Sequence, residues 1–169
     1  MSKKRQQLTL FADEKDTLII EAVRNQFNSE QAALIKAHVT LCREDEIVPF
    51  EKVLKNLESF NEPVVSIDFG EVVRFSQGKG VLLPGIGTNK PFHQLRKAVL
   101  AGLAEPPRLH EPHITLMHPR NSSCTDAIFN QIKAYRFPCT IKFKTISLIE
   151  QGEGKEWTVL REFKLGDNR

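Results

Sequence analysis

Alternating and continuous apolar runs divide the chain into predicted strands and helices. Short runs rich in Val, Ile and Thr favour strands, whereas apolar residues spaced three or four apart favour helices. We therefore expect strands at 8–12, 33–42, 81–83, 112–117, 140–149 and 157–163, and helices at 13–28, 49–60, 92–103 and 125–135. Residues 64–69 and 71–75 are expected to form a hairpin, and the Gly-containing segment 76–80 a turn. The order strand, helix, strand, helix occurs in both halves of the chain.

Two of these predicted strands contain the same four-residue pattern. One is His38-Val39-Thr40-Leu41 and the other is His113-Ile114-Thr115-Leu116. In a strand, residues two apart share a face, so each His and Thr point one way and the two apolar residues the other. Each strand should therefore bury an apolar face and present an imidazole and a hydroxyl to a cleft.

Composition and charge describe an ordinary globular protein. The 169 residues are 40% hydrophobic and 27% charged, with a net charge of +3. This small positive charge permits an anionic substrate but does not require one. No apolar stretch is long enough to span a membrane, and Ser2-Lys3-Lys4-Arg5 is not followed by a signal-type core. Three cysteines without metal-binding spacing favour a reduced, cytoplasmic protein, which we expect to be a monomer.

Two imidazoles and two hydroxyls in one cleft suit phosphodiester chemistry. Histidine exchanges protons near neutral pH, so one His can act as general base and the other as general acid. Threonine hydroxyls beside them can donate hydrogen bonds to phosphoryl oxygens. A single His-x-Thr in a strand is more often structural, but its duplication favours a catalytic interpretation. This scheme needs no metal and no cofactor.

Other residues are weaker candidates for substrate contacts. By alternation Lys36 shares the face of His38, and Arg43 and Arg120 follow the two motifs; each could bind phosphate or be solvated. Phe11 is our candidate for stacking on a base. His110, His113 and His118 do not make a recognisable metal set, because in a strand His118 faces away from His113 and no carboxylate completes it. We expect His110 and His118 to be satisfied by neighbours or exposed to solvent.

The paired motifs carry a family resemblance. An H-x-T-L motif in each half, the string Pro112-His113-Ile114-Thr115-Leu116, and the opening strand 8–12 followed by a helix resemble the two-histidine (2H) phosphoesterase superfamily, which includes 2'-5' RNA ligase-like proteins and cyclic phosphodiesterases. The resemblance implies an α+β fold with two pseudo-symmetric lobes of antiparallel sheet and outer helices around a central cleft. It also implies that His38 and His113 are catalytic and that Thr40 and Thr115 bind phosphate.

We therefore expect a single domain over residues 1–169, with one lobe at about 1–62 and the other at about 63–169. A strand from one lobe can belong to the sheet of the other. The expected function is metal-independent opening of 2',3'-cyclic phosphates on nucleotides or RNA ends. The alternatives are 2'-5' RNA ligase or hydrolase activity, and a non-catalytic module that binds RNA or nucleotides. The near-equivalence of the motifs leaves open which His is the base.

Overall fold

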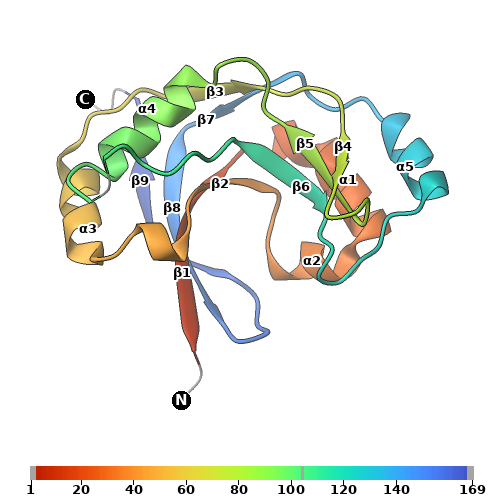
Figure 1. Cartoon of the computed structure of the whole chain (residues 1–169), viewed down its shortest axis with the longest axis horizontal. Coiled ribbons are helices and arrows are strands. Elements are labelled where there is room, and N and C mark those ends of the chain that lie inside the picture. The colour runs from red at the N-terminus through yellow and green to blue at the C-terminus, as the bar shows by residue number, and fades with distance from the viewer. Residues whose placement is uncertain (1–2, 104, 167–169) are drawn as a thin grey trace.

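The computed structural model describes residues 3–103 and 105–166, which form nine strands and five α-helices (Figure 1). The helices are α1 (Glu14–Phe27), α2 (Ser29–Leu34), α3 (Phe50–Ser59), α4 (Lys90–Val99) and α5 (Asp126–Lys133), and a short 3-10 helix, η1, spans Glu44–Glu46. The strands are β1 (Lys4–Phe11), β2 (His38–Cys42), β3 (Val65–Asp68), β4 (Val73–Phe75), β5 (Gly80–Pro84), β6 (His113–Met117), β7 (Thr140–Phe143), β8 (Thr145–Gly152) and β9 (Thr158–Lys164).

Seven strands form one antiparallel sheet in the order β4-β5-β6-β2-β1-β8-β9, and β3 pairs with β7 in a second, two-stranded sheet. The predicted α+β class with antiparallel sheet and outer helices is confirmed. Strands from the two halves pair at two places: β2 with β6, at Val39 and Ile114, and β1 with β8. Helices α3 and α4 lie on one side of the molecule, and α1, α2 and α5 on the other (Figure 1).

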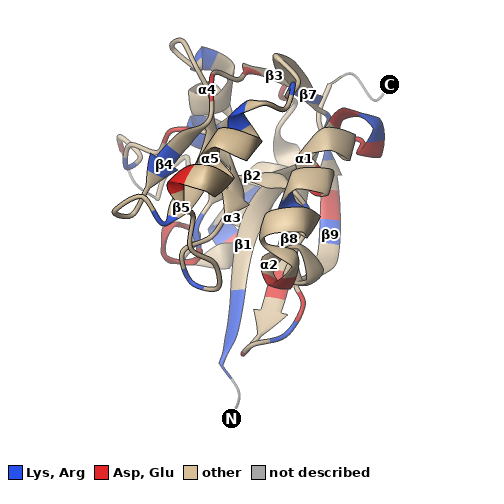
Figure 2. Ribbon diagram, turned by 90° about the vertical axis from the view of Figure 1, so that its right-hand side faces the viewer, with Lys and Arg blue, Asp and Glu red and all other residues tan. Residues whose placement is uncertain are grey.

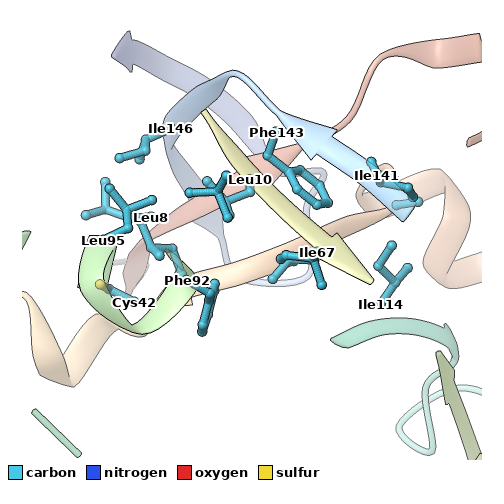
Figure 3. Packing of buried hydrophobic residues seen from close by; sticks show 14 of the residues in the cluster. Leu8, Leu10, Cys42, Ile67, Phe92, Leu95, Ile114, Ile141, Phe143 and Ile146 are labelled. Carbon is cyan, nitrogen blue, oxygen red and sulfur yellow. The ribbon is translucent and has the colours of Figure 1, made fainter. Parts of the chain in front are cut away.

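One hydrophobic core joins these layers. It contains Leu8 and Leu10 from β1, Ile114 from β6, and side chains from β3, β7, β8 and α4 (Figure 3). Both motif strands have the same burial pattern: the apolar residues are buried, while the His and Thr between them are half-buried. The apolar half of each motif therefore anchors the strand in the core, as the alternation predicts.

Local sequence explains several element ends. The turn from β4 to β5 uses left-handed backbone at Ser76, Gln77 and Gly78, with φ of 54°, 58° and 82°. Glycine adopts this conformation without a steric cost, which suits the tight reversal. Thr125 caps α5 by accepting a hydrogen bond from the backbone N–H of Ile128 at 3.2 Å.

Three predictions of local structure were wrong. Residues 29–34 form helix α2, so the first motif strand begins at His38 rather than near residue 33. The segment 64–69 does not form a hairpin with 71–75, because β3 pairs with the distant β7. The predicted strand 140–149 is divided into β7 and β8, which belong to different sheets.

The predicted division into lobes near residue 62 stays a prediction. Strands β8 and β9 follow β6 in the chain but extend the sheet beyond β1. None of the helices in the described part of the chain combines the length and apolar character needed to cross a bilayer.

Candidate active site

The polar faces of β2 and β6 open onto one pocket. The antiparallel register pairs Val39 with Ile114, which places His38 across from Thr115 and Thr40 across from His113. All four side chains line a cavity of about 170 Å³. The other lining residues are Arg5, Gln7, Arg24, Gln31, Ile35, Arg43, His118, Arg120 and Trp157.

The two motif histidines are oriented in the same way. His38 Nδ1 lies 2.8 Å from the carbonyl oxygen of Lys36, and His113 Nδ1 lies 3.0 Å from the carbonyl oxygen of Glu111. A carbonyl oxygen can only accept, so Nδ1 carries the proton in each ring. The neutral imidazole then has its lone pair on Nε2, which is the atom left to take or give a proton in the pocket.

The pocket is strongly cationic. Four Arg residues line it, and none of the described residues contributes a carboxylate to its lining. Such a site favours a small anion, because guanidinium groups match the geometry of phosphate oxygens. Basic residues also occupy the start of β1, which is coloured blue in Figure 2.

Burial sets the protonation state of His38. Desolvation by the surrounding side chains lowers the pKa of His38 to about 4, against the opposing effect of its hydrogen bond to Lys36. The positive charges of Arg24 and His113 lower it further. His38 is therefore neutral at pH 7 and can accept a proton.

An ion pair between a buried arginine and a half-buried glutamate holds the chain immediately before His38. Arg24, only 2% exposed, pairs with Glu21 and donates through Nη2 to the carbonyl oxygen of Ile35 at 2.7 Å. The Glu21 carboxylate accepts from the backbone N–H of Ala37 at 3.2 Å. The carbonyl of Lys36 that orients His38 lies between these two tethered residues.

A second buried arginine connects the segments that contain the motifs. Arg96 of α4 is 2% exposed and donates to the carbonyl oxygens of Leu41 in β2 and of Arg108 before β6, the latter at 2.8 Å. Its Nη2 also lies 2.6 Å from Glu46 Oε1. Because one side chain bonds to both segments, Arg96 fixes their relative position.

His110 and His118 are closer to the site than expected. His110 Nε2 donates to the carbonyl oxygen of Thr40 at 2.9 Å, and its ring centroid lies 6.0 Å from that of His113. Burial lowers the pKa of both His110 and His118. The expectation that His118 faces away from the motif histidine was wrong, because β6 ends at Met117 and strand alternation no longer applies.

The weaker candidates separate into two groups. Arg43 and Arg120 line the pocket with the motif residues. Lys36 and Phe11 do not; they line a neighbouring cavity, although the Phe11 ring lies edge-on to His38 with centroids 6.0 Å apart. Lys36 precedes β2, so alternation does not direct its side chain, and its Nζ lies 3.9 Å from Glu14.

Several lining residues were missed at the level of sequence. Arg5 and Gln7 could have been found, because they alternate with the buried Leu8 and Leu10 along β1. Arg24, in the last turn of α1, and Trp157, just before β9, reach the pocket through tertiary packing and give no local signal. Across residues 3–103 and 105–166, no group of three or more His, Cys, Asp or Glu side chains is arranged to hold a metal ion.

Comparisons with known proteins extend over most of the chain. No curated protein sequence matches it significantly. Its fold is similar to that of E. coli LigT complexed with 3'-AMP, at 16% identity and a TM-score of 0.69 over 99% of this chain and 100% of that one. A phosphoesterase structure is similar at 15% identity and a TM-score of 0.68, over 97% of this chain and 99% of that one. TT0787 of Thermus thermophilus is similar at 15% identity and a TM-score of 0.57, over 98% of this chain and 100% of that one.

The family model of the 2'-5' RNA ligase superfamily matches residues 11–155, a span that contains both motifs. This match confirms the resemblance that the paired H-x-T-L motifs carry. The chain therefore belongs to the 2'-5' RNA ligase superfamily of two-histidine phosphoesterases.

Proposed function

We propose that this protein is a metal-independent phosphodiesterase that opens 2',3'-cyclic phosphates of nucleotides or RNA ends. The observation that supports this most is the pair of imidazoles, His38 and His113, each fixed through Nδ1 to a backbone carbonyl at the same pocket. Membership of the superfamily supports an RNA or nucleotide substrate. LigT structures of the same fold contain phosphate or 3'-AMP, and a small cationic pocket suits the phosphate group that these two ligands share.

The two histidines divide the proton transfers. A water molecule attacks phosphorus and gives its proton to Nε2 of His38, which burial keeps neutral. The bond between phosphorus and one ribose oxygen breaks, and His113 Nε2 protonates that oxygen. The product is a nucleoside monophosphate, and a proton exchange with solvent restores both rings.

The remaining groups stabilise the charge that develops on the phosphoryl oxygens. Thr40 and Thr115 donate hydroxyl hydrogen bonds to the non-bridging oxygens, while Arg43 and Arg120 supply positive charge. All of these groups belong to the chain itself, so we expect a monomer to be active. We also expect the protein to act in the cytoplasm.

A second candidate function is the formation or cleavage of 2'-5' RNA linkages. The family to which the chain belongs favours it, and the chemistry is closely related. A 5'-hydroxyl can replace water as the nucleophile, with His38 taking its proton and His113 again protonating the ribose oxygen. Both reactions therefore use the same catalytic groups and differ in the nucleophile that reaches phosphorus.

The test is turnover of 2',3'-cyclic nucleotides in excess EDTA, with ¹⁸O-labelled water to mark hydrolysis. His38→Ala and His113→Ala should each lower kcat/KM by about 10² to 10⁴. The double variant should be little worse than the poorer single one, because either loss disables the concerted transfer. His93→Gln is the matched control, since His93 does not line the pocket and contacts the side chain of Glu111, not the carbonyl oxygen that orients His113.

Near-wild-type turnover in both His→Ala variants would contradict the assignment of the catalytic residues. Loss of activity in EDTA with rescue by a divalent cation would contradict the metal-independent scheme. Joining of a cyclic-phosphate oligonucleotide to a 5'-hydroxyl oligonucleotide, without hydrolysis, would favour the second candidate.

A further inference from the structure

The catalytic pocket is too small to hold a whole nucleotide. Its volume of about 170 Å³ is below the roughly 300–1,000 Å³ of pockets that enclose small ligands. A larger cavity of about 580 Å³ adjoins it, and the two share Ile35 and Trp157 in their walls. We call this larger cavity the side pocket. Its other wall residues come mainly from the end of β1, from α1, from residues 32–37 and from β9.

Apolar and aromatic side chains form a large part of the walls of the side pocket. Phe11 and Trp157 line it, together with Ile35 and two side chains that are unusually exposed for their type, Leu18 at 68% and Val159 at 49%. Base stacking on aromatic side chains is a sequence-tolerant source of affinity for nucleotides. The apolar side chains around the opening offer further surface that a planar base can cover.

The side pocket adjoins the reacting centre directly. Phe11 pairs with His38 across β1 and β2, and its ring lies edge-on to the imidazole at 6.0 Å. Trp157 is tethered to the end of α2, because its backbone N–H donates to the carbonyl oxygen of Leu34 at 2.9 Å. The Arg5 guanidinium lies 5.3 Å from the indole centroid and connects this wall to the cationic pocket.

Charge separates the two cavities. The side pocket is lined by Glu14, Glu156 and Glu162, and by Glu21, whose carboxylate is already paired with Arg24. Its single cation is Lys36, whereas four arginines line the catalytic pocket. A phosphate is therefore attracted to the catalytic pocket and repelled from the side pocket. An uncharged base suits the side pocket, since carboxylates accept hydrogen bonds from its N–H groups.

We propose that the side pocket binds the nucleobase of the nucleotide whose phosphate occupies the catalytic pocket, with the base against Phe11 and Trp157. This subsite deepens the proposed function and rests on it for the identity of the ligand. The carboxylate lining should favour guanine, which presents two adjacent N–H donors, over uracil, whose single N–H lies between two carbonyls. The same pocket then determines both affinity and base preference.

Trp157 is the only tryptophan in the chain, so its fluorescence reports on this wall directly. The experiment titrates the intact protein with the 3'-monophosphates of guanosine, adenosine, cytidine and uridine, and with ribose 5-phosphate and inorganic phosphate as base-free probes. Saturable quenching by the nucleotides, tightest by about tenfold for guanosine over uridine, is expected. The base-free probes should compete for binding but leave most of the emission unchanged.

Variants then assign the effect to the side pocket. Phe11→Leu and Trp157→Ala should each weaken nucleotide binding by about 5- to 100-fold while changing phosphate binding little. Binding to Trp157→Ala is measured by calorimetry, because this variant has lost its fluorophore. Tyr135→Leu is the matched control, because it removes an exposed aromatic ring from a separate cavity. Binding equal to wild type in both the Phe11 and Trp157 variants would overturn the proposal.

The binding assay needs no turnover, so the two proposals can fail separately. Quenching with base preference in a protein that opens no cyclic phosphate would support the side pocket and contradict the proposed function. Equal kcat/KM for all four 2',3'-cyclic nucleotides, with quenching by inorganic phosphate as strong as by nucleotides, would contradict the side pocket and leave the proposed function standing.

Discussion

The partly desolvated imidazole of His38 should make the stability of the protein depend on pH. Its pKa is about 4 in the folded protein, whereas an unfolded histidine has a pKa near 6.5. Below pH 6.5 the unfolded chain therefore binds a proton at this position that the folded protein does not. The free energy of unfolding falls as the pH drops from 6.5 towards 4, and it is restored as the pH rises.

The size of this effect follows from the pKa difference. Each pKa unit corresponds to about 1.4 kcal/mol, so His38 alone should remove about 2 kcal/mol of stability between pH 7 and pH 5. Urea unfolding followed by Trp157 fluorescence measures it at both pH values. His38→Gln removes the titrating group while keeping a polar side chain, so the variant should lose about 2 kcal/mol less than wild type over this interval.

The comparison with the variant isolates His38. Burial also lowers the pKa of His110 and His118, which adds to the pH dependence of both proteins and cancels in their difference. Equal losses of stability in the wild type and in His38→Gln would refute the inference that the pKa of His38 is lowered in the folded protein and that its imidazole is neutral. Kinetics should give a matching result. In a plot of kcat/KM against pH, activity falls on the acidic side as the base becomes protonated, and the midpoint of this fall should lie near pH 4 rather than 6.5.

Three further predictions concern the groups around the motif histidines. Thr40→Val or Thr115→Val should lower kcat/KM about tenfold to a thousandfold, with Thr→Ser milder at each site; steady-state kinetics unchanged by Val in a folded protein would make the hydroxyls structural. Arg24→Met should lower kcat/KM about tenfold and move the acidic limb of its pH profile to higher pH, because a cation that lowers the pKa of His38 is removed. A pH profile whose acidic limb does not move would exclude this electrostatic role. Arg96→Met should cost about 3–5 kcal/mol in urea unfolding, since it leaves Glu46 and two carbonyls without their partner, and a loss below about 1 kcal/mol would contradict that interpretation.

The sequence was most informative where a local pattern decides the structure. The alternation of His, Val, Thr and Leu is a direct consequence of strand geometry, and both motif strands follow it. The helical spacing at 13–28 and 49–60 likewise predicted α1 and α3 with closely matching ends. These features depend on a few neighbouring residues and not on the rest of the chain.

The predictions failed where distant segments decide the outcome. Residues 33–37 resemble a strand, but 33 and 34 belong to a helical turn and the rest are fixed by contacts from α1, including the Arg24 bond to Ile35. The partner of β3 lies more than seventy residues away, in β7, and no local signal identifies it. Trp157 and Arg24 reach the pocket for the same reason, through packing between elements far apart in sequence.

The pairing of β1 with β8 has a consequence for biosynthesis. Residues 4–10 of β1 pair with residues 146–152, so one edge of β1 lacks its partner until about 140 more residues have been translated. At about 5–20 residues per second, that edge of the nascent chain stays open for roughly 7–28 s. Unpaired strand edges promote aggregation, and charged residues such as Lys4 and Arg5 oppose it by disfavouring pairing with other chains. The basic start of β1 should therefore protect the newly made polypeptide during translation, before the pocket that it later helps to line exists.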